Sequence, residues 1–455
     1  MGLNREADFS SGRSKGAFPA KTIAFKSIGC RTNQEETAAL SRRLIDAGHR
    51  VVDKIDKAQI IIVNTCSVTA EAESKTLRFL HAVSKVASNA KICLTGCFAQ
   101  RSPEGFRAAA GVHWVVGNTR KNDIPEILLD DSGGVYWGEC SSASERPLAP
   151  LGEPGGPAQG TRTRFFIKIQ EGCDNRCAYC IVPLLRGRSR SASFSEILTV
   201  CRKAVEAGYK EVVLTGTHIG QYREGGRGDM LSLVEAIIAL PGDFRLRLSS
   251  LDPRDLTEGL LSVIANEKKV CRHLHVSVQS FSARVAAAMG RGGPYLETLA
   301  RRLASFRKDA PDAGIGGDFI VGFPGETESM FMETVEQAAA IGFSYGHVFR
   351  YSPRAGTAAA LFADQVPDPE KTRRSVFLRD ALKAGGGAFI DRLKGTPHRI
   401  IVEEERPAQG VASNYLRMEA PGVEAEKNSW LDVTLVGRGP GQKICRAVPA
   451  KRTTA

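Results

Sequence analysis

The sequence predicts an α/β protein built from three parts. Short apolar runs alternate with helical patterns over residues 21–138 and again over residues 164–392, which is typical of parallel strands joined by helices. A stretch rich in Pro, Gly and Ser at 139–163 lies between them and predicts a linker. Residues 393–455 keep strand-like runs but lose the long helical patterns, so we expect a small β-barrel there.

The composition limits the class of protein. The chain has 455 residues, a net charge of +12 and eleven cysteines. No apolar run approaches the roughly 18 residues that span a bilayer, and the polar residues 1–20 predict a disordered tail, not a secretory signal. An odd number of cysteines suits a reducing compartment, so we expect a cytoplasmic protein without a membrane partner. The charge favours a polyanionic partner, although solubility alone would also explain it.

The first part predicts a doubly wound sheet. Its strands are "KTIAFKSIGC", "AQIIIVNTC" and "AKICLTGC", with helical patterns at 33–48 and 73–88 between them. The part at 164–392 contains six strand candidates, each followed by a loop or a helical pattern. Six such units predict a partial (βα)6 barrel, in which the functional residues lie at the carboxyl ends of the strands.

Three cysteines cluster directly after the first strand of this second part. Cys173, Cys177 and Cys180 have C-x-x-x-C-x-x-C spacing, and thiolates so close together select zinc or an iron–sulfur cluster. A structural zinc site closes with a fourth ligand, but the next Cys or His is Cys201, on an apolar helix face. Three thiolates on a four-iron cluster leave one iron open. That iron can bind the amino and carboxylate groups of S-adenosylmethionine, a route into radical chemistry. A zinc loop is the alternative.

Three further cysteines each close a predicted strand of the first part. Cys30, Cys66 and Cys97 are about one strand–helix unit apart, so parallel pairing is expected to bring them to one edge of the sheet. They would then hold a second four-iron cluster with one open iron, although buried cysteines are also common as small hydrophobic residues. Cys93 lies inside its strand and is expected in the core. Four cysteines receive no role: Cys140, Cys201, Cys271 and Cys445.

Several stretches resemble the radical S-adenosylmethionine (SAM) methylthiotransferases over nearly the whole chain. They are "GCRTNQEET", "NTCSVT", "TGCFAQR", "EGCDNRCAYCIVP", "VVLTGTHIG", "RLRLSSLDP", "LHVSVQS", "DFIVGFPGETE" and "HVFRYSPRAGTAAA". The resemblance implies two [4Fe–4S] clusters and SAM as cofactors. It implies that the triplet binds the cluster that generates the radical, and that the N-terminal trio binds a second cluster that carries sulfur. It also implies a methylthiotransferase domain at 21–138, a radical SAM core at 164–392 and a TRAM-like barrel at 393–455.

The resemblance further implies which residues contact the cofactor. They are Tyr179, Gly216, Thr217, Ser249, Gln279 and Asp318. Polar residues at strand ends also cap backbone groups, which is the alternative for each. Asn33 and Gln34 are similar to the family's polar pair after the first cysteine, and Asn33 could equally cap the helix that starts near it. Phe281 departs from the family, which usually has Gly there; a glycine would permit a positive φ or a close approach to ligand.

The run "IVPLLRGRSRS" resembles the MtaB-like branch, which methylthiolates C2 of N6-threonylcarbamoyladenosine at tRNA position 37. Because that nucleoside carries a carboxylate, arginines suit it. The candidate substrate-binding residues are Arg186, Arg188, Arg350 and Arg354, each of which could instead be a surface residue or pair with phosphate. The alternatives are RimO-like action on a ribosomal-protein aspartate, MiaB-like action on isopentenyladenosine in tRNA, or a non-catalytic RNA-binding protein with two zinc sites. We also expect a monomer and an electron donor such as flavodoxin or ferredoxin.

Overall fold

The computed structural model describes residues 20–106, 111–140, 148, 151–152, 154, 163–224, 228–439 and 444–450. It divides into two compact units. The first comprises the N-terminal residues through Gly152 together with 171–175 and 180–190, and the second comprises the rest of the chain. Residues 1–19 of the predicted tail and most of the predicted linker lie outside the described residues.

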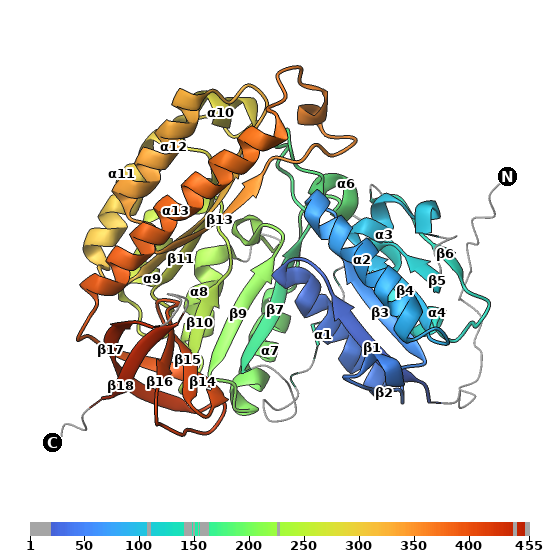
Figure 1. Cartoon of the computed structure of the whole chain (residues 1–455). Helices are drawn as coiled ribbons and strands as arrows, with labels where there is room; N and C mark the ends of the chain where they lie inside the picture. Colours follow the sequence, from blue (N-terminus) through green and yellow to red (C-terminus); the bar gives the residue numbers. More distant parts are fainter. Residues whose placement is uncertain are drawn as a thin grey trace. The chain divides into compact units, whose positions relative to one another are not determined.

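The first unit contains a parallel six-stranded sheet in the order β2-β1-β3-β4-β5-β6 among the described strands (Figure 1). Its elements are β1 Thr22–Ser27, α1 Arg31–Asp46, β2 Arg50–Val51, β3 Ile60–Thr65, α2 Ala70–Val86, β4 Lys91–Gly96, α3 Cys97–Arg101, β5 Val112–Val116, α4 Ile124–Ile127 and β6 Gly134–Tyr136. The three predicted strands and both predicted helices are therefore confirmed.

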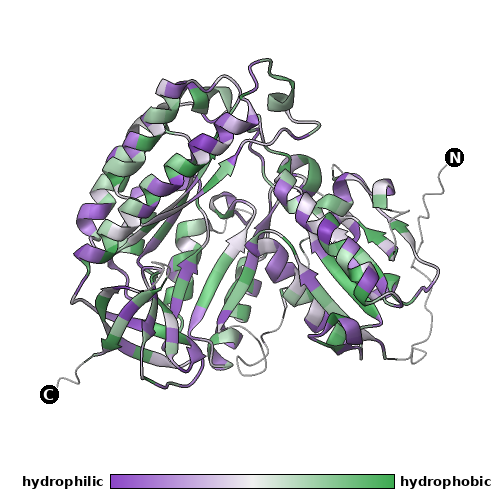
Figure 2. Cartoon of the chain, viewed as in Figure 1, coloured by the Kyte–Doolittle hydropathy of each residue, from purple (hydrophilic) through white to green (hydrophobic). Residues whose placement is uncertain are grey.

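Strand β3 shows why this sheet is covered on both faces. All six of its residues are buried. Ile61 and Val63 pack into the cluster that contains Leu80 of α2, whereas Ile60 and Ile62 face the opposite cluster that contains Leu40 and Leu44 of α1. Because neighbouring side chains of a strand point to opposite faces, a continuous apolar run requires helices on both sides. Figure 2 shows the resulting band of hydrophobic strands between helices with mixed surfaces.

The six strands predicted for 164–392 are all present and pair in parallel. Two sheets hold them, β10-β9-β7-β8 and β11-β12-β13, and single parallel bridges such as Leu251 to Val276 lie between them. The elements are β7 Arg164–Glu171, α6 Val182–Arg186, β8 Arg190–Ser191, α7 Phe194–Glu206, β9 Glu211–Gly216, α8 Met230–Ile238, β10 Arg245–Leu248, α9 Glu258–Asn266, β11 His273–Gln279, α10 Ala283–Ala288, α11 Pro294–Asp309, β12 Gly314–Val321, α12 Glu328–Ile341 and β13 Tyr345–Arg350. This arrangement confirms the predicted partial (βα)6 barrel.

The C-terminal part is a closed barrel, as predicted. Its strands are β14 Pro397–Glu405, β15 Ala408–Ala412, β16 Arg417–Ala420, β17 Trp430–Arg438 and β18 Cys445–Pro449, in the order β14-β15-β16-β18-β17. It follows α13, Asp368–Arg392, a long helix that the sequence pattern did not predict. No helix in the described part of the chain is both long and apolar enough to span a bilayer.

Glycines within α13 account for its close packing. A Cβ on Gly386 would lie 2.5 Å from the carbonyl oxygen of Ser344, and one on Gly387 would lie 2.5 Å from the Arg438 guanidinium. These glycines disfavour a helix by propensity, but they allow α13 to pack closely against neighbouring segments. Helix propensity alone therefore did not predict α13.

Buried charges join the small barrel to the parallel sheet. Glu211 of β9 pairs with Arg245 and Arg247 of β10, each at 2.7 Å, and none of these side chains is more than 7% exposed. The two guanidinium groups also donate to the carbonyl oxygens of Val411 and Ala412 in β15, at 2.7 and 3.0 Å. Burial acts to raise the pKa of Glu211, but Arg247 and Arg245 outweigh it and hold the carboxyl ionised. The joint is thus a fully satisfied polar network.

Glu211→Ala is expected to destabilise the protein by about 3–5 kcal/mol, because it leaves two buried guanidinium groups without their carboxylate. The exposed pair Asp243–Arg399, at 3.0 Å, links the same two parts, and Asp243→Ala should cost less than about 1 kcal/mol. Thermal unfolding and limited proteolysis of the barrel compare the two variants. Equal effects would contradict the role assigned to the buried network.

Gly96 at the end of β4 provides a second test of the fold. It has φ +97°, and a Cβ there would lie 2.3 Å from the carbonyl oxygen of Thr65. Gly48 has φ +91° but nothing near its Cβ position. We expect Gly48→Ala to cost about 1–2 kcal/mol for the left-handed conformation alone and Gly96→Ala to cost clearly more. Melting temperatures measure the difference, and a Gly96→Ala protein as stable as Gly48→Ala would refute the packing argument.

Candidate cysteine and cofactor sites

Parallel pairing brings the three N-terminal cysteines to one edge of the sheet. Strands β1, β3 and β4 are neighbours. Cys66 and Cys97 directly follow the last residues of β3 and β4, and Cys30 lies three residues beyond β1, where it is the N-cap of α1. The expected convergence is therefore observed, while Cys93 is fully buried in β4 as predicted.

Cys66 lies beside the turn that leads to Cys30. A Cβ on Gly29 would lie 3.2 Å from the sulfur of Cys66. Burial, together with Cys97 and Cys30, raises the pKa of the Cys66 thiol to about 12. Among the described residues, Cys30, Cys66 and Cys97 do not form a set with all ligand atoms within 4.8 Å, as a single ion would require. Soft donors spread over one edge fit a multi-iron cluster better than one zinc ion.

Asn33 does not cap the helix, so that alternative is wrong. Helix α1 begins at Arg31 with Cys30 as its N-cap. The fully buried amide of Asn33 instead donates to the carbonyl oxygens of Ile28 and Thr65, at 3.1 and 2.9 Å. Asn33 therefore joins the ends of β1 and β3 beneath the cysteines. Gln34, the other member of the polar pair, is partly buried.

Arg186 lies in an ionic network of the first unit. Its guanidinium is 4% exposed and contacts Glu36 of α1 and Glu171 of β7, both at 2.6 Å. Burial acts to lower the pKa of Arg186, but the negative groups around it, Glu36 first, outweigh that effect and raise it. Lys121 pairs with Glu36 at 2.6 Å. No sequence pattern pointed to the contact with Glu36, because Glu36 lies 150 residues from Arg186 along the chain.

The cysteine triplet follows the carboxyl end of β7, as predicted. Gly172 has φ +78°, and a Cβ there would lie 1.9 Å from the carbonyl oxygen of Arg188, so the turn into Cys173 requires glycine. All three cysteines are partly exposed. Three accessible soft donors at this position fit the radical-generating cluster.

Within the second unit, an arginine that sequence reasoning missed approaches Cys177. The Arg291 guanidinium lies 3.9 Å from the Cys177 sulfur and pairs with Asp252 at 2.8 Å. Asp252 also accepts hydrogen bonds from Arg254. Burial acts to raise the pKa of Asp252, but hydrogen bonds from Arg254 and the charge of Arg291 lower it to about 2. Arg291 is therefore held by an ionised carboxylate.

The predicted cofactor residues lie mainly at the carboxyl edge of the sheet. Gly216 ends β9 and Thr217 follows it, Ser249 follows β10, and Gln279 ends β11. Asp318 lies inside β12, and Tyr179 packs against a cluster that includes Met289 and Tyr351. Their cofactor contacts stay predictions.

Phe281 does not adopt the conformation that a glycine would allow. Among the described residues near it, the positive φ falls on Gln279, at 70°. The Phe281 ring packs near Phe319 and Phe343, and its N–H donates to Thr334 Oγ1 at 3.0 Å. The aromatic residue therefore belongs to the core behind the loop.

A hydrogen-bonded chain crosses three neighbouring strands and was not predicted. Tyr345 Oη lies 2.7 Å from His273 Nε2 and 2.8 Å from His275 Nδ1. His275 and His347 then contact the two oxygens of Asp318 at 3.1 and 3.0 Å. Burial acts to raise the pKa of Asp318, but the two histidines outweigh it and lower the pKa. The sequence signal for this chain was the alternation in "HLH" and "YGH", which places His273 with His275, and Tyr345 with His347, on one face of a strand.

The four arginines proposed for substrate occupy different environments. Arg186 and Arg354 are buried, whereas Arg188 is 80% exposed and pairs with Asp174. Arg350 is exposed and donates to Thr372. Arg186 and Arg188 belong to the first unit, and Arg350 and Arg354 to the second. Their contacts with substrate stay predictions.

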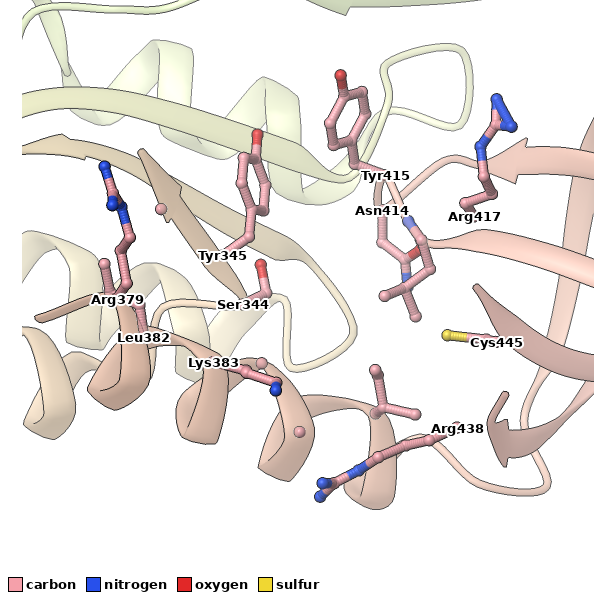
Figure 3. Close-up of a pocket in the computed structure, with 15 residues that line it drawn as sticks. Ser344, Tyr345, Arg379, Leu382, Lys383, Asn414, Tyr415, Arg417, Arg438 and Cys445 are labelled. Carbon is pink, nitrogen blue, oxygen red and sulfur yellow. The ribbon is translucent and has the colours of Figure 1, made fainter. Parts of the chain in front are cut away.

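A pocket of about 390 Å³ lies between α13, the start of β13 and the small barrel (Figure 3). The rings of Tyr345 and Tyr415 point away from Lys383 and Arg438 in this view. The β15–β16 turn carries Asn414 and Tyr415, and Tyr415 stacks on His273 at 4.6 Å. The pocket adjoins the amino end of β13, so it is separate from the carboxyl-edge residues.

Known protein families match both parallel parts of the chain. Residues 22–117 match the "Uncharacterized protein family UPF0004", and residues 167–338 match the Radical SAM superfamily. The structure of a radical SAM methyltransferase, TsrM from Kitasatospora setae, is similar in fold, with a TM-score of 0.56 and 13% identity over 72% of this chain and 73% of that chain.

Curated relatives extend the similarity to nearly the full length. Threonylcarbamoyladenosine tRNA methylthiotransferase MtaB of Thermotoga maritima is 34% identical over 87% of this chain and 89% of its own length. The Bacillus subtilis protein of the same name is 34% identical over 89% and 91%. A tRNA-2-methylthio-N6-dimethylallyladenosine synthase of Neisseria gonorrhoeae is 32% identical over 84% and 88%.

Identity at this level over almost the whole chain is decisive for family membership, and the edge-clustered cysteines fit the iron–sulfur centres of that family. Its cofactors are SAM and two [4Fe–4S] clusters. The chain is similar to proteins named MtaB. It therefore belongs to the radical SAM methylthiotransferases that act on tRNA.

Proposed function

We propose that the protein inserts a methylthio group at C2 of N6-threonylcarbamoyladenosine at position 37 of tRNA, giving 2-methylthio-N6-threonylcarbamoyladenosine. The observation that carries this choice is the similarity to proteins named for that reaction from three bacteria, at 32–34% identity over 87–89% of the chain. The arginine run "RGRSR" supports it, because the threonylcarbamoyl group carries a carboxylate.

A dimethylallyladenosine substrate is the second candidate. It is favoured by the 32% identity to the Neisseria gonorrhoeae synthase, which is close to the identity with the MtaB proteins. The two substrates differ in charge at the N6 group, so arginines near the substrate decide between them. None of the relatives described above is named for action on a ribosomal-protein aspartate, so we do not propose that substrate.

We assign the cluster ligands by position. Cys173, Cys177 and Cys180 would hold the radical-generating cluster, and Cys30, Cys66 and Cys97 would hold the second. A reduced cluster with an open iron supplies radical chemistry from SAM. The residues at the carboxyl edge, Gly216, Thr217, Ser249, Gln279 and Asp318 with Tyr179, would bind and orient that cofactor.

The remaining parts would serve the same reaction. Domain boundaries at 21–138, 164–392 and 393–455 separate a methylthiotransferase domain, the radical SAM core and a TRAM-like barrel. The barrel turn with Asn414 and Tyr415 contacts the core, so tRNA would meet other faces of the barrel. A cytoplasmic monomer reduced by flavodoxin or ferredoxin completes the proposal.

The substrate is tested by mass spectrometry of tRNA nucleosides from strains with and without the gene. Loss of 2-methylthio-N6-threonylcarbamoyladenosine, with the dimethylallyl derivative unchanged, is the expected result. Loss of the dimethylallyl derivative instead would select the second candidate. An unchanged nucleoside profile would reject both.

Cys66→Ala is expected to remove about half of the roughly eight irons that two four-iron clusters contain. Cys93→Ala is the matched control, because its thiol lies in the same sheet but inside the core, and it should keep the full iron content. Iron analysis and absorbance after anaerobic reconstitution measure both. Full loading of Cys66→Ala, or a preparation that holds only zinc, would contradict the cluster assignment.

Arg354→Leu tests the carboxylate pocket. We expect kcat/KM on threonylcarbamoyl-modified tRNA to fall about tenfold or more, since a charged hydrogen bond is worth roughly 1.5–3 kcal/mol, while the affinity for tRNA lacking the modification changes little. Arg373→Leu is the control, because Arg373 pairs with Glu328 and Glu370 on the outer helices. An equal loss in turnover and in binding of unmodified tRNA would discard the pocket.

A further inference from the structure

Arg186 connects two segments that carry cysteines. It is the last residue of α6, and its guanidinium bonds to Glu36, in the helix that Cys30 caps. The same group bonds to Glu171, two residues before Cys173. A third contact, at 3.1 Å, runs to the Oδ1 atom of Asn33. All of these residues belong to the first unit.

Contacts of Arg186 and of the residue before it lead to two of the N-terminal cysteines. The Asn33 Oδ1 atom that accepts from Arg186 also lies 3.5 Å from the Cys30 sulfur. Leu185, the preceding residue, packs with Cys97. Asn118 donates to the Leu185 carbonyl oxygen at 2.9 Å and lies 3.6 Å from the Cys97 sulfur. Side-chain and backbone contacts therefore fix Arg186 beside these cysteines.

Two further cations share the carboxylates that bind Arg186. Lys121 pairs with Glu36 at 2.6 Å, and Arg190 pairs with Glu171 at 3.3 Å. In these ion pairs three cations share two carboxylates. Arg186 and Glu36 are both buried, and a charge acts more strongly in a low dielectric than in water.

We propose that Arg186 is a positioning residue that supplies the positive charge next to the N-terminal cysteine trio and thereby raises the reduction potential of the cluster bound there. This rests on the cluster assignment in the proposed function. A cluster with three thiolates is anionic and becomes more so on reduction, and net charge and hydrogen bonding are among the factors that set its potential. A buried cation therefore favours the reduced state. This role replaces a direct contact between Arg186 and the substrate carboxylate.

The experiment is a redox titration followed by electron paramagnetic resonance on the full-length, reconstituted protein. Cys173, Cys177 and Cys180 are replaced by Ala in the parent, so that the signal comes from the N-terminal cluster alone. Into this parent are placed R186Q, R186K and E36Q. R190Q is the matched control, since Arg190 shares the Glu171 carboxylate with Arg186. Iron content and circular dichroism verify loading and folding.

The expected shifts have opposite signs. R186Q should lower the potential, R186K should stay near the parent, and E36Q should raise it because one negative charge is lost. R190Q should move the potential less than R186Q does. If R186Q does not fold, the positive shift of E36Q still carries the test, since Arg186 remains in place there.

Three outcomes would overturn the proposal. They are a folded, loaded R186Q with the parent's potential, an equal shift in R190Q, or an E36Q protein whose potential stays the same or falls. Weaker binding of threonylcarbamoyl-modified tRNA by R186Q at an unchanged potential would instead support a direct contact between Arg186 and the substrate carboxylate. A parent that holds no iron–sulfur signal would instead refute the cluster assignment itself, and the two failures are thus distinguished.

Discussion

Parallel strand pairing places chemically active residues at the ends of strands on one edge of a sheet. In the first unit, β1, β3 and β4 end side by side, and each is followed by a cysteine. In the second, β9, β10 and β11 end in or next to the polar residues proposed for SAM. The backbone geometry allows distant segments to supply ligands together, because parallel neighbours must end on the same side. Both cofactor regions depend on this one constraint.

Both units contain a buried ionic network, and the network has a different role in each unit. Glu211 with Arg245 and Arg247 joins the small barrel to the parallel sheet through backbone carbonyls of β15. Every strong donor in that network has an acceptor, so it fixes how these parts of the second unit meet. Glu36, Glu171 and Arg186 instead lie near the cysteines. There the charges can act on the cluster that these cysteines are proposed to bind.

The histidine–tyrosine–aspartate chain shows how the second unit prepares a proposed cofactor residue. Asp318 is kept ionised by His275 and His347, and Tyr345 connects His275 with His273. Tyr415, from the turn of the small barrel, stacks on His273. The barrel therefore stabilises side chains of the sheet interior as well as closing on itself. This gives Asn414 and Tyr415 of the turn a structural role.

Periodicity and spacing in the sequence determined the α/β class, the three strands of the first part, the six strand candidates of the second, the closing barrel and the two sets of cysteines. These features are local, or follow from repeated strand–helix units, so apolar patterns and spacing suffice to predict them. Only the tertiary structure decided which residues far apart in the sequence contact one another. Arg186 reaches Glu36 at a distance of 150 residues along the chain, and Asn33 joins two strand ends instead of capping α1. Helix α13 was missed because its glycines serve contacts with Ser344 and Arg438. Such contacts depend on which surfaces pack together, and a one-dimensional pattern carries no record of that.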